Sequence, residues 1–158
     1  MRRAVVLCLA AGLALPAVAA AVLPLALGDG TLAVRSGDGL VKLNLRSGIT
    51  LGRAVGTLEV LNPDVDCSDL SVWNWDTEIA TKRDSCVFKS SEDPIRFRLT
   101  DGEDVRVTGH GIWLSVVGRG KAWLEGSDTK VRDGQYSLNG APFKSLPDDG
   151  RMFVIGGS

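Results

Sequence analysis

Hydrophobic and polar residues alternate in many short stretches along the chain. These stretches include TLAV, LVKLNL, TLEVL, IRFRL, IWLSVV and MFVI. An alternation with a period of two indicates a strand with one buried face. Asp-Gly or Asn-Gly dipeptides separate many of the stretches, and such dipeptides favour tight turns. The pattern predicts an all-β fold of short antiparallel strands and hairpins, arranged as a β-sandwich, a barrel or a β-solenoid-like coil.

The register of one hairpin can be predicted around the Asn-Gly dipeptide at 139–140. A two-residue turn there sets Leu138 opposite Ala141. The same register sets Tyr136 opposite Phe143, so that all four side chains share one face.

A second hairpin is predicted around 101–103. An odd-numbered loop sets Leu99 opposite Val105, which matches apolar residues across the two strands. The same register places Arg98 opposite Arg106 on the polar face, with Arg96 close by. These three arginines form the basic patch that the sequence predicts. Neighbouring carboxylates commonly relieve such a patch, and the alternative is a site for an anionic ligand.

A weak internal repeat relates GDGLVKLNLRSG at 37–48 to GHGIWLSVVGRG at 109–120, at an offset of 72 residues. Three glycines match without gaps. The repeat fits a duplicated strand-turn unit, as in a solenoid or a pseudo-symmetric barrel, and it fits two similar hairpins equally well.

The first 19 residues have the pattern of a secretory signal peptide. Two arginines precede an apolar run, and Ala17-Val18-Ala19 offers small residues to a signal peptidase. Cleavage is expected to leave residues 20–158 as a single domain without a transmembrane span, and an uncleaved anchor is the alternative. That domain has 16 Lys and Arg against 19 Asp and Glu, a net charge of −3. So small an acidic excess argues against nucleic acid as a partner.

Two cysteines, Cys67 and Cys86, remain after residue 19. In an exported chain a disulfide between them is the simplest expectation. Free thiols and a metal site are the alternatives. With one histidine in the chain the usual second pair of metal ligands is missing, so no metal and no cofactor are expected.

Residues 62–94 interrupt the strand pattern and are predicted to form a long loop held by that disulfide. The loop carries VWNWD, in which Trp73 and Trp75 are two residues apart and Asp76 follows. In a strand the two rings would share a face. Burial in a small core is the commoner use of such large rings and is the favoured interpretation, and stacking on sugars is the alternative. Acidic residues at 64, 66 and 69 lack the spacing of an EF-hand.

The sequence offers little support for catalysis. The glycines around His110 lack the G-x-G-x-x-G and P-loop spacings, so they are expected to mark turns. No G-x-S-x-G elbow accompanies that histidine, and no acid-base pair stands out among the 19 acidic residues. The chain is therefore interpreted as a non-enzyme.

Two blocks, IRFRLTDGEDVRVTGHGIWLSVVGRGKAWLEG and DGQYSLNGAPFKSLP, together with the export signal, resemble small uncharacterised secreted proteins of actinobacteria. The resemblance covers about 28–61 and 95–156 and leaves out 62–94. It implies the β-rich class and export from the cell, and it implies no activity.

The resulting hypothesis is an exported structural or binding module of the bacterial envelope or extracellular space, with cell-wall polysaccharide as a possible partner. A carbohydrate-binding module and a secreted hydrolase are the rival hypotheses. The residues singled out for a ligand are Trp73, Trp75, Asp76, Arg96, Arg98 and Arg106.

Overall fold

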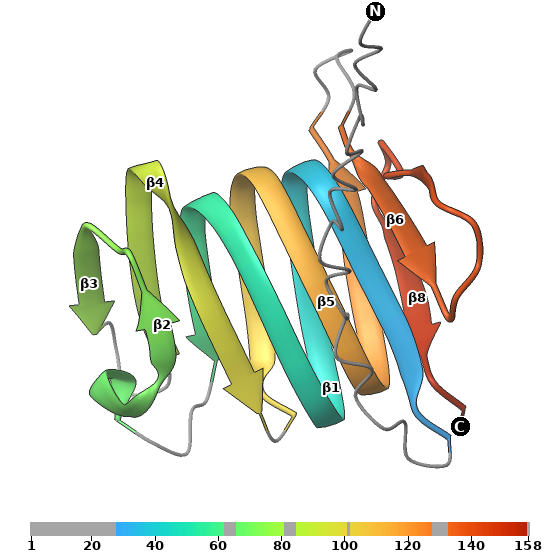
Figure 1. Cartoon of the computed structure of the whole chain (residues 1–158), viewed down its shortest axis with the longest axis horizontal. Coiled ribbons are helices and arrows are strands. Elements are labelled where there is room, and N and C mark those ends of the chain that lie inside the picture. The colour runs from blue at the N-terminus through green and yellow to red at the C-terminus, as the bar shows by residue number, and fades with distance from the viewer. Residues whose placement is uncertain (1–27, 62–65, 81–84, 101, 128–132, 158) are drawn as a thin grey trace, which may run out of the picture.

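A computed structural model describes residues 28–61, 66–80, 85–100, 102–127 and 133–157 (Figure 1). Within these residues nearly all regular structure is strand, and the only helix is the three-residue 3-10 turn η1. The predicted all-β class is therefore confirmed. The elements are β1 (Gly30–Leu61), η1 (Cys67–Asp69), β2 (Ser71–Trp73), β3 (Thr77–Ala80), β4 (Ser85–Thr100), β5 (Asp104–Gly126), β6 (Gln135–Leu138), β7 (Lys144–Ser145) and β8 (Arg151–Ile155).

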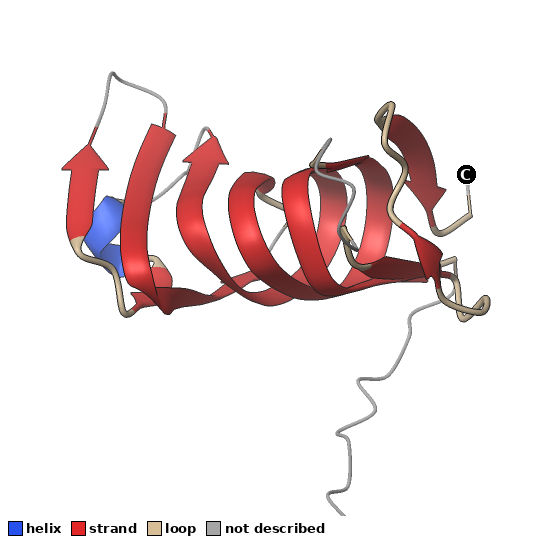
Figure 2. Cartoon of the chain, turned by 90° about the horizontal axis from the view of Figure 1, so that it is seen from above, coloured by secondary structure: helices blue, strands red, loops and turns tan. Residues whose placement is uncertain are grey.

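The three long strands β1, β4 and β5 bend and pass between two layers (Figures 1 and 2). The intertwining of β1 and β5 shows in their pairing. Leu40 lies opposite both Thr108 and Glu125, which are 17 residues apart in β5. This segment of β1 therefore lies between two different segments of β5. The result is a flattened antiparallel coil that combines the predicted sandwich and solenoid.

Each layer takes segments from several strands. We call one the front layer, whose order is β2, β4 (95–100), β1 (49–54), β5 (113–118), β1 (30–34) and β6. We call the other the rear layer, whose order is β3, β4 (86–89), β1 (57–61), β5 (104–109), β1 (39–45), β5 (120–126) and β8.

Glycines form the bends between the layers. Gly109 lies opposite both Gly39 and Gly56, and its φ is +151°. A Cβ atom on Gly109 would stand 2.0 Å from the carbonyl oxygen of Val55. Only glycine fits so close to a neighbouring backbone. These glycines were predicted to mark turns between strands, and they instead bend strands that continue.

The bends also explain the weak internal repeat. Residues 37–48 run from one glycine bend through the rear layer to the next bend, which includes Gly48. Residues 109–120 do the same through the front layer, ending at the bend that contains Gly118. Each copy is therefore one passage across the molecule between two bends, which agrees with a solenoid-like repeat.

The core lies between the layers and contains the apolar positions of the alternating pattern. Every second side chain of the long strands is mostly buried there, and those of Val34, Val107 and Leu114 are fully buried. Their polar neighbours point outward to solvent. Each face of the molecule is therefore lined by the residues that the alternation assigns to the polar side.

The predicted hairpin at 101–103 is wrong. In both layers β1 lies between β4 and β5, so Arg98 lies opposite Leu51 in the front layer. Arg106 lies opposite Lys42 and Glu59 in the rear layer. The two arginines are on opposite faces because both strands cross between layers and each pairs with β1.

The turn at 139–140 is confirmed, but its register is not. The amide of Ala141 donates to the carbonyl of Leu138 at 3.0 Å, and both turn residues have positive φ. Beyond the turn, however, Tyr136 lies opposite Lys144 and not Phe143. Pairing therefore resumes one residue later than a two-residue turn predicts.

The disulfide between Cys67 and Cys86 is present, with the two Cα atoms 5.6 Å apart. The long loop of residues 62–94 is otherwise wrong. Its described part contains η1, β2, β3 and the first half of β4, and β2 and β3 both pair with β4. The predicted signal segment, 1–19, lies outside the described residues. No helix among the described residues has the length and apolarity to span a membrane.

Candidate functional site

The outer side of the front layer carries a row of two tryptophans and two arginines, one on each of four neighbouring strands. Trp73 of β2 lies opposite Arg96 of β4. Arg96 lies opposite Arg53 of β1, and Arg53 lies opposite Trp113 of β5. All four are exposed, and the two indoles are 52% and 39% accessible. We call Trp73–Arg96–Arg53–Trp113 the cross-strand row.

An open groove runs along this row. Its lining includes all four side chains of the row, together with Asn74, Leu51 and Arg98. Arg98 is on β4, two residues beyond Arg96, and its side chain is on the same outer side. The groove therefore presents three guanidinium groups between two indole rings.

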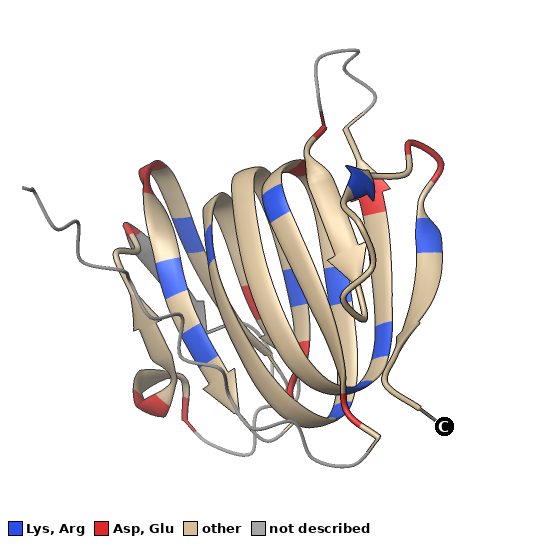
Figure 3. Cartoon of the chain, turned by 45° about the vertical axis from the view of Figure 1, so that its right-hand side comes forward, with Lys and Arg blue, Asp and Glu red and all other residues tan. Residues whose placement is uncertain are grey.

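The arginines of the groove have no acidic partner among the described residues. The ion pairs of the described chain are Arg106–Glu59 and Arg119–Asp29, and neither involves Arg53, Arg96 or Arg98. The one cation–π contact among the described residues joins Arg35 to Phe143, outside the groove. Figure 3 shows basic positions on the half of β4 that ends in its arrowhead and acidic ones at the bend before it. The groove is thus a basic surface within an acidic protein.

The cross-strand row ends at a structural boundary on each side. On one side β2 is the last strand of the sheet order. On the other side the pairing of β1 with β5 shifts between Val34 and Gly37, where Ser36 has a φ of +50°. Arg35 lies in this bulge and stacks on Phe143, with 4.1 Å between the guanidinium carbon and the ring centroid. The row is therefore limited to four strands.

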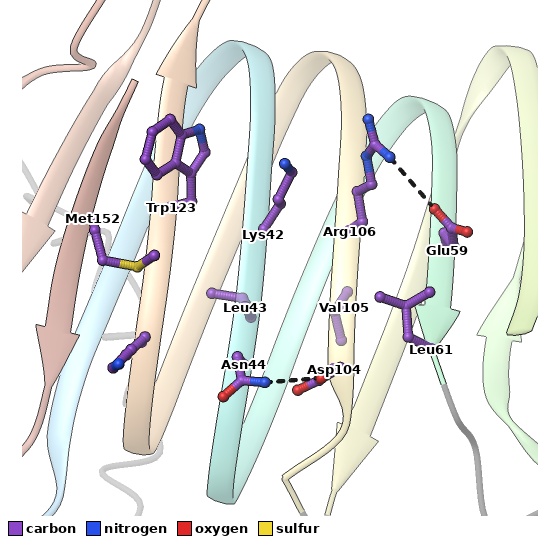
Figure 4. Close-up of a pocket in the computed structure, with 11 residues that line it drawn as sticks. Lys42, Leu43, Asn44, Glu59, Leu61, Asp104, Val105, Arg106, Trp123 and Met152 are labelled. Carbon is purple, nitrogen blue, oxygen red and sulfur yellow. Dashed lines mark hydrogen bonds and ion pairs between the residues drawn. The ribbon is translucent and has the colours of Figure 1, made fainter. Parts of the chain in front are cut away.

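The rear layer has a hollow of its own, shown in Figure 4. Lys42, Arg106, Trp123 and Met152 line it. Several of its polar groups have partners among the described residues. Arg106 lies 4.0 Å from Glu59, the amide of Asn44 donates to Asp104 at 2.9 Å, and the indole N–H of Trp123 donates to Glu125 at 3.0 Å. Arg106, Glu59 and Asp104 thus have partners within the hollow, whereas Lys42 and Lys121 have no ion pair among the described residues. The hollow therefore contains both signs of charge, whereas the charged side chains of the groove are all arginines.

The structure brings together three of the predicted site residues, Trp73, Arg96 and Arg98. Trp75 is apart from them, because Asn74 has a φ of +60° and ends β2. The ring of Trp75 packs against Phe88, with 6.0 Å between centroids. The two indoles therefore do not share a strand face, and the favoured prediction that both are buried in a small core is also wrong, because both remain exposed.

Asp76 and Arg106 also lie outside the groove. The carboxylate of Asp76 accepts hydrogen bonds from the amide and the hydroxyl of Ser91, at 2.9 and 3.2 Å. The bond from the backbone amide is the main cause that lowers the pKa of Asp76. This carboxylate has a structural role in joining the bend of β4 to the residues after β2. Arg106 lines the rear hollow.

Sequence reasoning did not identify Arg53 and Trp113 as members of the site. They are 60 residues apart, and they meet because β1 pairs with β5. The alternating pattern does predict that both side chains point outward, because their neighbours in the sequence are apolar and buried. The missing information was which strands lie side by side.

The groove can bind anions and flat apolar surfaces. Guanidinium groups bind carboxylates and phosphates through two parallel N–H···O bonds, and exposed indoles offer faces for stacking. His110 lies exposed at a glycine bend. Among the described residues no three His, Cys, Asp or Glu side chains gather as metal ligands would. A comparison with protein families, curated proteins and solved structures finds no match.

Proposed function

We propose that the protein is an exported, non-enzymatic binding module that holds an anionic polymer of the bacterial envelope in the front-layer groove. The observation that carries the proposal is the cross-strand row. In it two arginines, which have no ion pair with any described residue, lie side by side between two exposed tryptophans. The disulfide between Cys67 and Cys86 supports an extracytoplasmic location, where disulfides persist.

A structural role alone does not account for the arginines of the row. Like charges directly opposite each other in a sheet destabilise it by roughly 0.2–1 kcal/mol. Arg53 and Arg96 are such a pair, and no described carboxylate within ion-pair distance offsets their repulsion. A bound anion would offset it. The arginines of the groove are therefore better explained by binding of an anionic ligand than by a contribution to the stability of the fold.

Anionic ligands are favoured over neutral sugars because of the three guanidinium groups. A neutral glycan would use the two indoles and leave Arg53, Arg96 and Arg98 without counter-charges. Tryptophan and arginine are also the residues that most often dominate binding energy at interfaces. Both residue types are concentrated in this groove.

The test is retention of the purified protein on insoluble cell-wall material. We expect the wild type to be retained and the variant Arg53→Gln/Arg96→Gln to be lost at about 0.1 M salt. Retention of the wild type should weaken as salt rises, because the ionic attraction is screened over about 10 Å at that concentration.

Arg106→Gln is the matched control. It removes one guanidinium from the rear layer, which is outside the groove, and should leave retention unchanged. If the wild type is not retained, or if the Arg53/Arg96 variant is retained like the wild type, the proposed function fails.

A further inference from the structure

We infer that the ligand is a linear acidic glycan that lies across the strands and places four consecutive sugar units over the cross-strand row. This inference rests on the proposed function and specifies the polymer. Neighbouring strands are about 4.8 Å apart. A sugar unit in an extended β-1,4-linked chain is about as long. A glycan perpendicular to the strands would therefore keep register with one side chain per unit.

The four subsites follow the order of the row. Trp73 and Trp113 stack on the ring faces of the two outer units. Arg96 and Arg53 bind the acidic groups of the two inner units. The chain would run along the long axis of the coil, which crosses the strands in Figure 1.

The length of the bound segment follows from the ends of the row. Beyond Trp73 the described residues contain no further strand of this layer, because β2 ends the sheet order. Beyond Trp113 the bulge at 34–37 breaks the register, and Arg35 is engaged with Phe143. Among the described residues, a fifth unit at either end would therefore meet no side chain in register. The binding affinity should therefore not increase for oligomers longer than four units.

The acid of the glycan is a ring carboxylate, as in a uronic acid. Adjacent arginines on neighbouring strands require negative groups on consecutive units. A carboxylate at the edge of a sugar ring leaves the flat face free for an indole, whereas a polyol phosphate chain has no ring face. Successive β-1,4-linked units turn their carboxylates to opposite edges of the chain. Arg98, two residues along β4 from Arg96, is placed to bind at one of these edges.

Calorimetric titration with β-1,4-linked mannuronate oligomers of two to six units tests the inference. We expect each unit up to four to strengthen binding, with the tetramer about tenfold tighter than the dimer and about equal to the hexamer. Trp73→Ala and Trp113→Ala should each reduce tetramer affinity to about that of the trimer and change trimer affinity by less than about twofold. The trimer can still occupy the three remaining subsites.

Trp123→Ala, in the rear layer, is the matched control and should change neither affinity. A smooth rise in affinity to six units, or an equal loss of dimer and tetramer affinity in the tryptophan variants, would overturn the four-unit register. Stronger binding of poly(glycerol phosphate) or of a single-stranded oligonucleotide would overturn the uronate assignment. Retention on wall material that depends on Arg53 and Arg96 would in each of these cases leave the proposed function standing.

Discussion

At the scale of single residues, the bends of the coil depend on positions where a side chain cannot be accommodated. Gly109 and Gly111 are two residues apart at one bend, yet they differ in their surroundings. A Cβ on Gly109 would overlap the backbone of Val55, whereas a Cβ on Gly111 would meet nothing within 4 Å. Both glycines have a positive φ, but only at Gly109 would a side chain also overlap the backbone. Comparing alanine variants at the two positions therefore measures the cost of the overlap.

We predict that Gly109→Ala lowers the free energy of unfolding by about 2–3 kcal/mol, because the backbone must move to admit the methyl group. Gly111→Ala, at a φ of +60°, should cost about 1 kcal/mol from the left-handed conformation alone. Urea unfolding followed by tryptophan fluorescence measures both. Equal losses in the two variants would contradict the steric explanation.

Asp76 provides a prediction about pH. Its hydrogen bonds with Ser91 lower its pKa in the folded state relative to the unfolded state. A carboxyl group with a lowered pKa stabilises the fold above its unfolded pKa, and this stabilisation is lost as the pH falls through the folded pKa. Asp76→Ala should therefore be less stable than the wild type at pH 7, and the difference should shrink as the pH falls below the usual aspartate range.

Urea unfolding of both proteins at pH 7 and at several acidic pH values provides the measurement. Asp76→Asn is the control, since its amide oxygen can still accept from Ser91 without titrating. A difference between Asp76→Ala and the wild type that stays constant down to the lowest pH would show that the charge of Asp76 contributes nothing.

At the scale of strands, the cross-strand row makes stability and binding oppose each other. We predict that Arg96→Thr raises the free energy of unfolding by about 0.5 kcal/mol at low salt, because it removes the repulsion from Arg53 and adds a residue that favours strands. The same variant should lose retention on wall material. Urea unfolding at low and high salt measures the effect, which salt should reduce.

Arg106→Thr is the comparison for that measurement. Arg106 lies opposite Lys42 on one side and Glu59 on the other, so repulsion and attraction nearly offset each other. We expect no gain in stability from Arg106→Thr. If Arg96→Thr is less stable than the wild type at low salt, the arginines of the row contribute to folding and the argument from repulsion is wrong.

At the scale of the whole molecule, the two layers of the coil are built from the same strands. Both β1 and β5 contribute segments to each layer, and those segments alternate across the sheet. Each layer needs both strands in place, and the partners are far apart in the sequence. Contacts of this kind make folding cooperative and slow.

We therefore predict a single unfolding transition for both layers and refolding over milliseconds to seconds, as is typical for proteins with long-range strand pairing. Variants that retain only Trp113 or only Trp123 would report on the front and the rear layer separately. Their fluorescence transitions in urea should coincide with each other and with the loss of far-ultraviolet circular dichroism. Two separate midpoints would show that the layers unfold independently.

The sequence by itself determined the features that depend on near neighbours. The alternation of apolar and polar residues sets which side of each strand is buried, so the all-β class follows from it, and so does the outward position of Arg96 and Arg98. The Asn-Gly turn at 139–140 is local in the same sense. Two cysteines in a chain with an export-like N-terminus were enough to predict the Cys67–Cys86 pair.

Only the tertiary structure decided which strands lie side by side. The two hairpin registers assumed that strands adjacent in sequence pair with each other, and β1 lies between β4 and β5 instead. For this reason Arg106 is on the face opposite to Arg98, and Arg53 and Trp113 join the site. Alternation specifies a face of a strand but not its neighbours. The neighbours follow from glycine bends and from packing between residues far apart in the chain, neither of which a local pattern contains.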